Sequence, residues 1–209
     1  MSVFSSRSHW IDSTAKRIFD VCLVLIAAPF LVLLIGVLSL MIVLIDQSPP
    51  LFWQWRVGKN GIPFRFYKLN TMGWYRSALP SGGASDVRAT PLGRVLRWLI
   101  LDEVPQILIN VIRGDMSLVG PRPLLKADID LMRACLGQKA FTEWFTAYCS
   151  VRPGWTGRFG ISSRRYKIHS KKYLLARKRH DIAYMRQASC WIDIKTICVH
   201  AVLPFIDRN

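Results

Sequence analysis

The chain has 209 residues, of which 29 are Lys or Arg and 13 are Asp or Glu, so its formal net charge is +16. It is also 51% hydrophobic and contains eight Trp. This length suits one domain of ordinary size with an appendage, and the charge favours anionic partners: phosphorylated substrates, an acidic membrane surface or nucleic acid. The five cysteines show no Cys-x-x-Cys spacing, which argues against a zinc site or a disulfide framework.

The first expected element is a long apolar segment. After the basic pair Lys16-Arg17, residues Val21–Ile45 carry no charge, and about 20 apolar residues suffice to cross the hydrocarbon core. The segment is too long for a signal peptide and lacks a small-residue cleavage site. Pro29 lies inside it, where a proline removes a hydrogen bond and bends a helix. Because basic residues flank both ends, two topologies stay open: a spanning helix, and a bent helix that returns to the same face.

A β-hairpin is expected next. Leu51–Val57 and Ile62–Lys68 alternate apolar and polar residues on either side of Asn60-Gly61, which is a strong hairpin signal. Residues 77–90, which contain Ser81-Gly82-Gly83, are expected to form a flexible loop.

Most of the remaining chain is expected to be helical. Leu92–Leu101 and Pro105–Ile112 hold more apolar residues than one buried face needs, which indicates amphipathic helices in a membrane surface. Residues 124–148 and the tail Ser189–Ile206 also show helical spacing. Residues 152–186 hold eleven Lys or Arg and one acid, so they form a solvated basic face, a contact with anionic headgroups, or both. The expected fold class is helix-dominated α+β, with a membrane-associated segment over 1–46 and a second domain over 47–209.

An acidic pair, Asp102-Glu103, lies between the two apolar helices. Carboxylates in an apolar setting need a cation or a metal nearby, and perturbed acids of that kind are candidates for catalysis. A structural explanation is also available. The pair would begin a helix and favour its dipole, with Pro105 in the first turn. The local pattern alone favours the structural explanation.

Several further motifs accompany this pair. The densest are Leu101-Asp-Glu-Val-Pro-Gln106, Gly114-Asp-Met-Ser-Leu-Val-Gly-Pro-Arg-Pro123 and Arg152-Pro-Gly-Trp-Thr-Gly157, with Lys16-Arg17-x-x-Asp20, Gln54-x-Arg56-x-Gly58-x-x-Gly61 and Tyr67-Lys68 before them. Together they resemble the bacterial sugar transferases that act as monotopic phosphoglycosyl transferases. The resemblance covers roughly residues 16 to 199, and the combination is specific although no single motif would be.

The resemblance implies an enzyme that moves a phospho-sugar from a UDP-sugar to polyprenyl (undecaprenyl) phosphate with release of UMP. This would be the first membrane step of exopolysaccharide or glycoconjugate synthesis. It also implies a re-entrant segment broken at Pro29 and a catalytic domain on the cytoplasmic face of the bacterial inner membrane, in contact with anionic lipids. Asp102 would be the nucleophile and the position of a magnesium ion, with Glu103 as second carboxylate. No nucleic-acid partner is expected, and a homodimer is left open.

This chemistry agrees with the residues themselves. A carboxylate can attack phosphorus and form an acyl-phosphate, which divides one transfer into two steps. Charge on the phosphoryl oxygens calls for fixed cations. Three cations are candidates for phosphate binding: Arg122 between two prolines, Arg97 near the helix junction, and Lys68 at the end of the hairpin. The alternative for each is an ordinary surface charge.

The chain departs from the family pattern in four places. Asn70 stands where a cation is usual, and Ala28 precedes Pro29 where a serine is common. Arg158-Phe159-Gly160-Ile161 replaces Leu-Ala-Gln-Val. Gln106-Ile-Leu-Ile-Asn110 carries one residue more than usual, which requires either a rotation of about 100° or a helical bulge. These departures leave the sugar specificity open.

Two other hypotheses remain at this stage. A non-catalytic basic protein that binds membranes or nucleic acid would account for the net charge, although it would have no need of a carboxylate pair between apolar segments. A bitopic protein with one spanning helix would account for Val21–Ile45.

Overall fold

A computed structural model describes residues 7–73, 88–163 and 166–206 of the chain. The loop expected over 77–90 therefore lies outside the described residues, apart from its end at 88–90. The helices are η2 (His9–Asp12), α1 (Thr14–Ile45), η3 (Lys59–Gly61), α2 (Pro91–Trp98), η5 (Leu101–Glu103), α3 (Val104–Gln106), η6 (Ile107–Val111), α4 (Lys126–Leu136), α5 (Gln138–Cys149), α6 (Arg158–Ser162), α7 (Lys171–Gln187) and α8 (Cys190–Ile206). The strands are β1 (Leu51–Val57), β2 (Pro63–Leu69), β3 (Ser117–Val119) and β4 (Gly154–Thr156). The expected helix-dominated α+β class with a long apolar N-terminal helix is confirmed.

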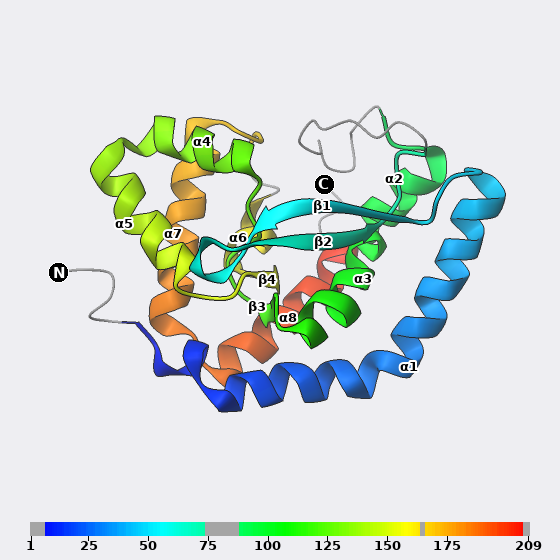
Figure 1. The fold of residues 1–209 in the computed structure, drawn as a ribbon, viewed down its shortest axis with the longest axis horizontal. Helices are drawn as coiled ribbons and strands as arrows, with labels where there is room; N and C mark the ends of the chain where they lie inside the picture. Colours follow the sequence, from blue (N-terminus) through cyan, green and yellow to red (C-terminus); the bar gives the residue numbers. More distant parts are fainter. Residues whose placement is uncertain (1–6, 74–87, 164–165, 207–209) are drawn as a thin grey trace.

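Helix α1 is long and apolar enough to cross a membrane by length and composition. Its first turn is capped by Ser13, whose side chain accepts a hydrogen bond from the backbone N–H of Lys16. Figure 1 shows that α1 bends about midway, so its two halves follow two sides of the molecule. Pro29, inside the helix, accounts for a bend because it removes a backbone donor and its ring clashes with the preceding turn.

The expected hairpin is present, and its turn is the one that the sequence indicates. Strands β1 and β2 are antiparallel, with Trp55 opposite Arg65. Asn60 and Gly61 both have positive φ, 58° and 72°, and these are the residue types that adopt the left-handed region most readily. Alternation places Phe66 in the core and leaves Trp55 53% exposed on the other face.

Residues 101–113 form one uninterrupted helical run, built from the 3₁₀ turn η5, the short α3, the π-turn η6 and a final two α-helical residues. The expected helix Pro105–Ile112 lies within it. The π-turn covers the place where the sequence carries one residue too many, and a π-turn accommodates one extra residue without breaking a helix. Of the two alternatives for that spacing, the structure therefore has the bulge.

A second small sheet was not expected from the sequence. Strand β3 pairs in parallel with β4, with Ser117 opposite Gly154 and Val119 opposite Thr156. The strands approach so closely that a Cβ on Gly154 would lie 2.0 Å from the backbone nitrogen of Gly120, so only glycine fits there. This pairing brings the segment after β3, with its Pro-Arg-Pro turn, next to the segment after β4.

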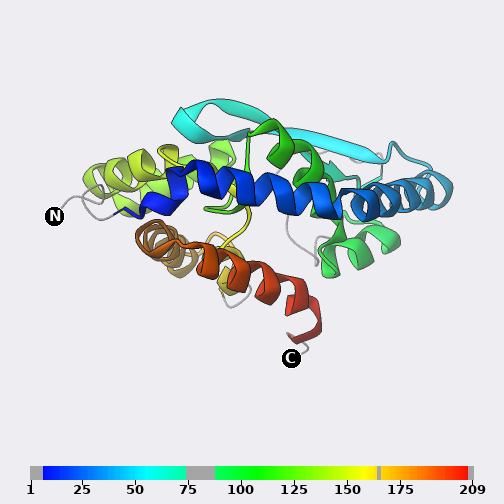
Figure 2. The same cartoon turned by 90° about the horizontal axis from the view of Figure 1, so that it is seen from below.

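The C-terminal helices complete the core. The expected helical regions at 124–148 and 189–206 correspond to α4, α5 and α8. Trp144 and Tyr148 of α5 are buried in a cluster with residues of α4 and α7. Figure 2 shows α8 and the hairpin on opposite sides of the N-terminal half of α1.

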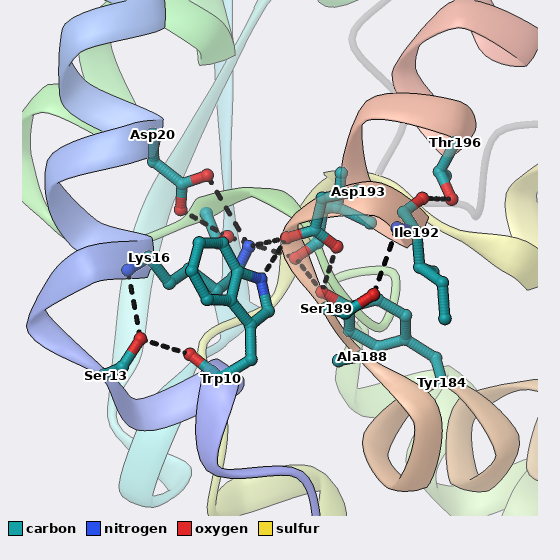
Figure 3. A network of polar contacts seen from close by, with 12 residues as sticks. Trp10, Ser13, Lys16, Asp20, Tyr184, Ala188, Ser189, Ile192, Asp193 and Thr196 are labelled. Carbon is teal, nitrogen blue, oxygen red and sulfur yellow. Dashed lines mark hydrogen bonds and ion pairs between the residues drawn. The ribbon is translucent and has the colours of Figure 1, made fainter.

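A buried polar network fastens α1 to the C-terminal helices (Figure 3). Lys16 Nζ lies 2.6 Å from Asp193 Oδ2 and 3.5 Å from Asp20 Oδ1. Asp193 also accepts a hydrogen bond from Trp10 Nε1 at 2.8 Å and from the Tyr184 hydroxyl at 2.9 Å. One buried cation, Lys16, thus serves two buried aspartates, and the charges of α1 and α8 meet as ion pairs.

Candidate active site

The two acidic residues of the sequence motif lie in η5, at the start of the helical run, and both are buried. Asp102 is 6% exposed and Glu103 is 8% exposed. Ile100, just before η5, has φ 61°, a left-handed conformation that costs about 1–2 kcal/mol for a residue other than glycine. This strained residue separates α2 from the helical run, which begins at Leu101 with Asp102 as its second residue. The structural explanation for the pair, a helix start followed by Pro105, therefore holds alongside any chemical role.

Lys68 joins the two carboxylates. Its Nζ lies 3.3 Å from Asp102 Oδ2 and 2.8 Å from Glu103 Oε1. Lys68 comes from β2, which packs against η5 and α3, so the hairpin delivers a cation to the acidic pair. The Lys68 ammonium also lies 5.6 Å from the centre of the Phe66 ring, an attractive cation–π distance.

The two neighbouring acids differ in their electrostatics. Burial raises the pKa of Asp102 above its ordinary value, with the charge of Glu103 adding to the rise, and the positive charges of Lys68 and Arg97 oppose it. Burial also acts to raise the pKa of Glu103, but Lys68 and Arg122 outweigh it and hold that pKa down to about 2. Glu103 is thus the fixed negative charge of the pair, and Asp102 is the more basic carboxylate. Two carboxylates with diverging environments are typical of catalytic sites.

Arg122, in the Pro-Arg-Pro turn after β3, also contacts the acidic pair. Its Nη2 lies 3.4 Å from Glu103 Oε1, and its side chain is 39% exposed. The negative charge of Glu103 raises the pKa of Arg122 further above its ordinary value. The guanidinium is therefore both held beside the acids and accessible to a ligand from outside.

Two buried arginines hold the backbone of the Pro-Arg-Pro turn. Arg177 Nη2 donates to the carbonyl of Arg122 at 2.8 Å, and Arg56 Nη1 donates to the carbonyl of Pro123 at 3.2 Å. Burial lowers the pKa of Arg56 to about 10, still far above neutrality. Arg56 lies 3.7 Å from Asp128 and Arg177 lies 3.9 Å from Asp181, so both cations have acidic partners.

A tyrosine hydroxyl secures the end of the same turn. Tyr148 OH accepts from the backbone N–H of Leu124 at 3.1 Å and donates to the carbonyl of Val57 at 2.7 Å. Tyr148 thus links the Pro-Arg-Pro turn to the hairpin, which carries Lys68. Of the residues that fix this turn, Arg56 is part of a sequence motif. Nothing in the sequence indicated that Arg177 and Tyr148 would hold the turn.

Arg97, the third predicted cation, lies in α2, and Thr71, just after the hairpin, orients its side chain. Its Nε donates to Thr71 Oγ1 at 2.7 Å, and its charge favours the ionised form of Asp102. Helix α2 approaches closely enough that a Cβ on Gly93 would lie 2.2 Å from the carbonyl oxygen of Thr71. The five predicted site residues therefore share one region, with Lys68 and Arg122 in contact with the carboxylates and Arg97 acting on Asp102 through space.

Gln106 belongs to the same region and was not predicted as a site residue. It is 1% exposed, and its Nε2 makes no hydrogen bond with any part of the chain that the structure describes. Gln106 follows Asp102 by about one helical turn, so both lie toward the same side of the run. A buried amide donor without an acceptor is rare in a protein interior. The motif Asp-Glu-x-Pro-Gln was the sequence signal that would have found it.

The carboxylate pair suits a magnesium ion by its donor chemistry. Magnesium takes oxygen ligands and usually binds one or two protein carboxylates, with water and substrate phosphates completing its shell. Lys68 contacts one oxygen of each acid, Oδ2 of Asp102 and Oε1 of Glu103. Within residues 7–73, 88–163 and 166–206, no cluster of three or more His, Cys, Asp or Glu side chains forms a metal site.

The family model for bacterial sugar transferases matches residues 11–206 of the chain. The chain belongs to this family. Among the similar proteins, the uncharacterized sugar transferase EpsL of Bacillus subtilis is 37% identical over 188 residues, which cover 88% of this chain and 84% of that protein. This bacterial sugar transferase is also 35% identical over 184 residues to the UDP-glucose:undecaprenyl-phosphate glucose-1-phosphate transferase of Caulobacter vibrioides, covering 87% of the chain and 66% of the relative.

Some relatives are much longer than this bacterial sugar transferase. The undecaprenyl-phosphate glucose phosphotransferase of Komagataeibacter xylinus is 36% identical over 212 residues, which cover 97% of the chain but only 38% of that protein. The chain thus spans less than half the length of that relative.

Proposed function

We propose that this bacterial sugar transferase moves a sugar-1-phosphate from a UDP-sugar to undecaprenyl phosphate, which initiates synthesis of a surface polysaccharide, and that Asp102 carries the phospho-sugar between the two half-reactions. The observation that carries the proposal is the contact of Lys68 with both buried carboxylates, next to Arg122. The names of the relatives support the substrate classes, since the Caulobacter protein is a UDP-glucose:undecaprenyl-phosphate transferase.

In the first half-reaction, an oxygen of the Asp102 carboxylate attacks the phosphorus that bears the sugar. A bond forms between that oxygen and phosphorus, the bond from phosphorus to the bridging oxygen breaks, and UMP leaves with the bridging oxygen. Arg122, whose side chain is accessible, is placed to bind the phosphate oxygens, and Lys68 keeps Asp102 ionised for attack.

In the second half-reaction, a phosphate oxygen of undecaprenyl phosphate attacks the same phosphorus. The acyl-phosphate bond breaks, the product is undecaprenyl diphosphate sugar, and Asp102 returns as a carboxylate. Lys68 and Arg122 hold the pKa of Glu103 below its ordinary value, so Glu103 stays charged and keeps both cations in place. We assign magnesium to Asp102, with Glu103 beside it; when bound, the ion neutralises phosphate charge and orients the leaving group.

The same proposal includes a re-entrant α1, with both ends on the cytoplasmic face of the inner membrane. The bend in Figure 1 supports it, as do the apolar residues around Pro29, of which Ile26 is 78% exposed and Phe30 is 67% exposed. Trp98 of α2 and Trp191 of α8 are 43% and 73% exposed, as expected for amphipathic helices at the membrane interface and its anionic lipids.

The test of the chemistry uses the purified protein with magnesium and a panel of UDP-sugars, without lipid acceptor. We expect a burst of UMP stoichiometric with the enzyme, and a mass increase of one sugar-phosphate on the peptide containing Asp102. Asp102→Asn should abolish both while its unfolding midpoint stays near that of the parent. UMP release that requires undecaprenyl phosphate from the start, with no adduct on Asp102, would overturn the proposal.

The topology has its own test. Ser2→Cys and Lys59→Cys variants in intact cells are treated with a membrane-impermeant thiol reagent from the periplasmic side. A re-entrant α1 protects both cysteines until the cells are opened, whereas a spanning helix exposes the N-terminal one. The unmodified protein, with its five native cysteines, sets the background.

A further inference from the structure

Asn110 is a buried amide that connects the helical run 101–113 with the hairpin. It is 0% exposed and lies in the π-turn η6. Its Nδ2 donates to the carbonyl of Arg65 at 2.7 Å, and its Oδ1 accepts from the backbone N–H of Tyr67 at 3.3 Å. Asn110 Nδ2 also donates to Asp115 Oδ2 at 3.2 Å. The amide therefore has three partners that fix its orientation.

These contacts have the pattern of a β-ladder. Neighbouring residues of a strand direct their backbone groups to opposite edges, and Arg65 and Tyr67 are two apart, so both present the same edge of β2. One side-chain amide donates to the first residue and accepts from the second, as a residue of an adjacent strand would do. Asn110 therefore fixes both the position and the direction of β2 beside the helical run.

The next residue of β2 is Lys68, whose Nζ contacts Asp102 and Glu103. The helical run and β2 are therefore joined at two points. Lys68 contacts the carboxylates at the beginning of the run, and the backbone of Arg65 and Tyr67 binds Asn110 near its end. Lysine has a long flexible stem, so the place of its ammonium depends on where its backbone is held. Without the amide, β2 would keep its pairing with β1 but lose this attachment to the helical run.

We propose that Asn110 is a positioning residue for the reaction, which holds Lys68 against the Asp102–Glu103 pair and so keeps Asp102 ready to attack phosphorus. The inference rests on the proposed function of Asp102. Asn110 acts through the backbone of β2, and the π-turn accommodates the extra residue of the sequence with Asn110 still at the edge of β2.

The first test is a double-mutant cycle between Asn110→Leu and Lys68→Met, read as the rate of the UMP burst. Asn110→Leu keeps the branched side-chain skeleton and removes both hydrogen bonds to β2. We expect it to slow the burst by about 100-fold, the size that follows from misplacing a reacting group by about 1 Å. In the Lys68→Met background the same substitution should slow the burst by less than about 3-fold, because the two residues act through one contact. Equal slowing in both backgrounds would mean a merely structural role and would overturn the inference.

The second test does not depend on turnover. The Lys68 ammonium is followed by ¹⁵N NMR at constant pH in protein with labelled lysine, and Lys68→Met identifies its signal. An ammonium held by two buried carboxylates exchanges its protons slowly with water, so Asn110→Leu should speed this exchange. An exchange rate that is unchanged in Asn110→Leu would overturn the inference, whatever the enzyme assay gives.

Two further variants guard against misfolding. Asn110→Ser stays polar but is too short for both contacts, so it should reproduce the direction of each effect even if Asn110→Leu unfolds. Thr196→Val removes a hydrogen bond from another buried residue, on α8, and should change neither the burst nor the proton exchange of Lys68. If the parent protein itself shows no UMP burst, the proposed function fails, while the NMR exchange rates still decide the role of Asn110.

Discussion

Lys16 Nζ and Asp193 Oδ2 lie 2.6 Å apart and join the start of α1 to α8 across 177 residues of sequence. Lys16 is 4% exposed and Asp193 is 0% exposed, so neither charge is compensated by water. Removing one partner of a buried ion pair leaves the other unpaired and typically costs about 3–5 kcal/mol. Lys16→Met leaves both Asp193 and Asp20 without their cation. We expect it to lower the free energy of unfolding by about this amount in detergent, measured by denaturant titration. Asp193→Asn should cost less, because Lys16 keeps Asp20 as a partner.

The double variant Lys16→Met, Asp193→Asn provides the decisive comparison. The charge of Asp193 is removed together with its cation, and only Asp20 loses its partner, so the double variant should be less destabilised than the sum of the single variants. Lys195→Met, an exposed position on the same helix, is the matched control and should change the free energy of unfolding by less than about 0.5 kcal/mol. Additive losses would show that Lys16 and Asp193 contribute independently.

The pH dependence of the first half-reaction follows from the environment of Asp102. The residue attacks as a carboxylate, and burial raises its pKa above the ordinary 3.8. The burst rate should therefore fall as the pH drops through this raised pKa, at a pH where an exposed aspartate would still be ionised. Lys68→Met removes a charge that opposes the rise, so its acid limb should lie at higher pH.

Lys68→Arg is the control for that prediction because it keeps a positive charge at the same position. Its acid limb should lie closer to that of the parent than to that of Lys68→Met. The profiles are recorded as burst rates over the pH range in which each variant stays folded. A limb that does not move in Lys68→Met would show that the ammonium does not govern the ionisation of Asp102.

The sequence was most informative where a signal is local. The alternation around Asn60-Gly61 predicts the hairpin because the turn requires left-handed residues there. The motif around Asp102 predicts a pair of acids at a helix start because neighbouring residues determine that start. Lys68 and Arg122 were also proposed from motifs, and the structure brings both to the carboxylates, although their roles await the experiments above.

What could not be foreseen depends on contacts between distant segments. Nothing near Lys16 indicates that its partner is Asp193, and the three-residue strands β3 and β4 are too short to give an alternation pattern. The supporting role of Arg177 was hidden in a basic stretch that looked like a solvated face or a lipid contact. The spacing at 106–110 reduced the possibilities to a rotation or a bulge, and only the π-turn in the structure decided between them.

The link between the Pro-Arg-Pro turn and the hairpin gives a further prediction. Tyr148→Phe removes one hydroxyl and leaves the N–H of Leu124 and the carbonyl of Val57 without that partner. Leu124 is fully buried, so we expect a loss of about 1–3 kcal/mol in the free energy of unfolding. Because Arg122 lies two residues before Leu124, the burst rate should fall as well, with the KM for the UDP-sugar raised. Unchanged stability would mean that water or a shifted backbone replaces the hydroxyl.

The π-turn η6 predicts an unusual tolerance to deletion. A π-turn is an α-helix with one residue inserted. Deleting Leu108 should therefore convert η6 to regular α-helix. The residues on either side of the deletion should still point toward the same neighbours as before. We therefore expect the deletion variant to retain its UMP burst within about tenfold, a difference of roughly 1.4 kcal/mol in barrier. Deletion of Thr142 from the regular helix α5 is the control. It should rotate Trp144 and Tyr148 by about 100° out of their cluster and abolish folding. Loss of activity in both deletions would show that η6 is not an accommodated insertion, and that Asn110 needs all five residues of the turn to reach β2.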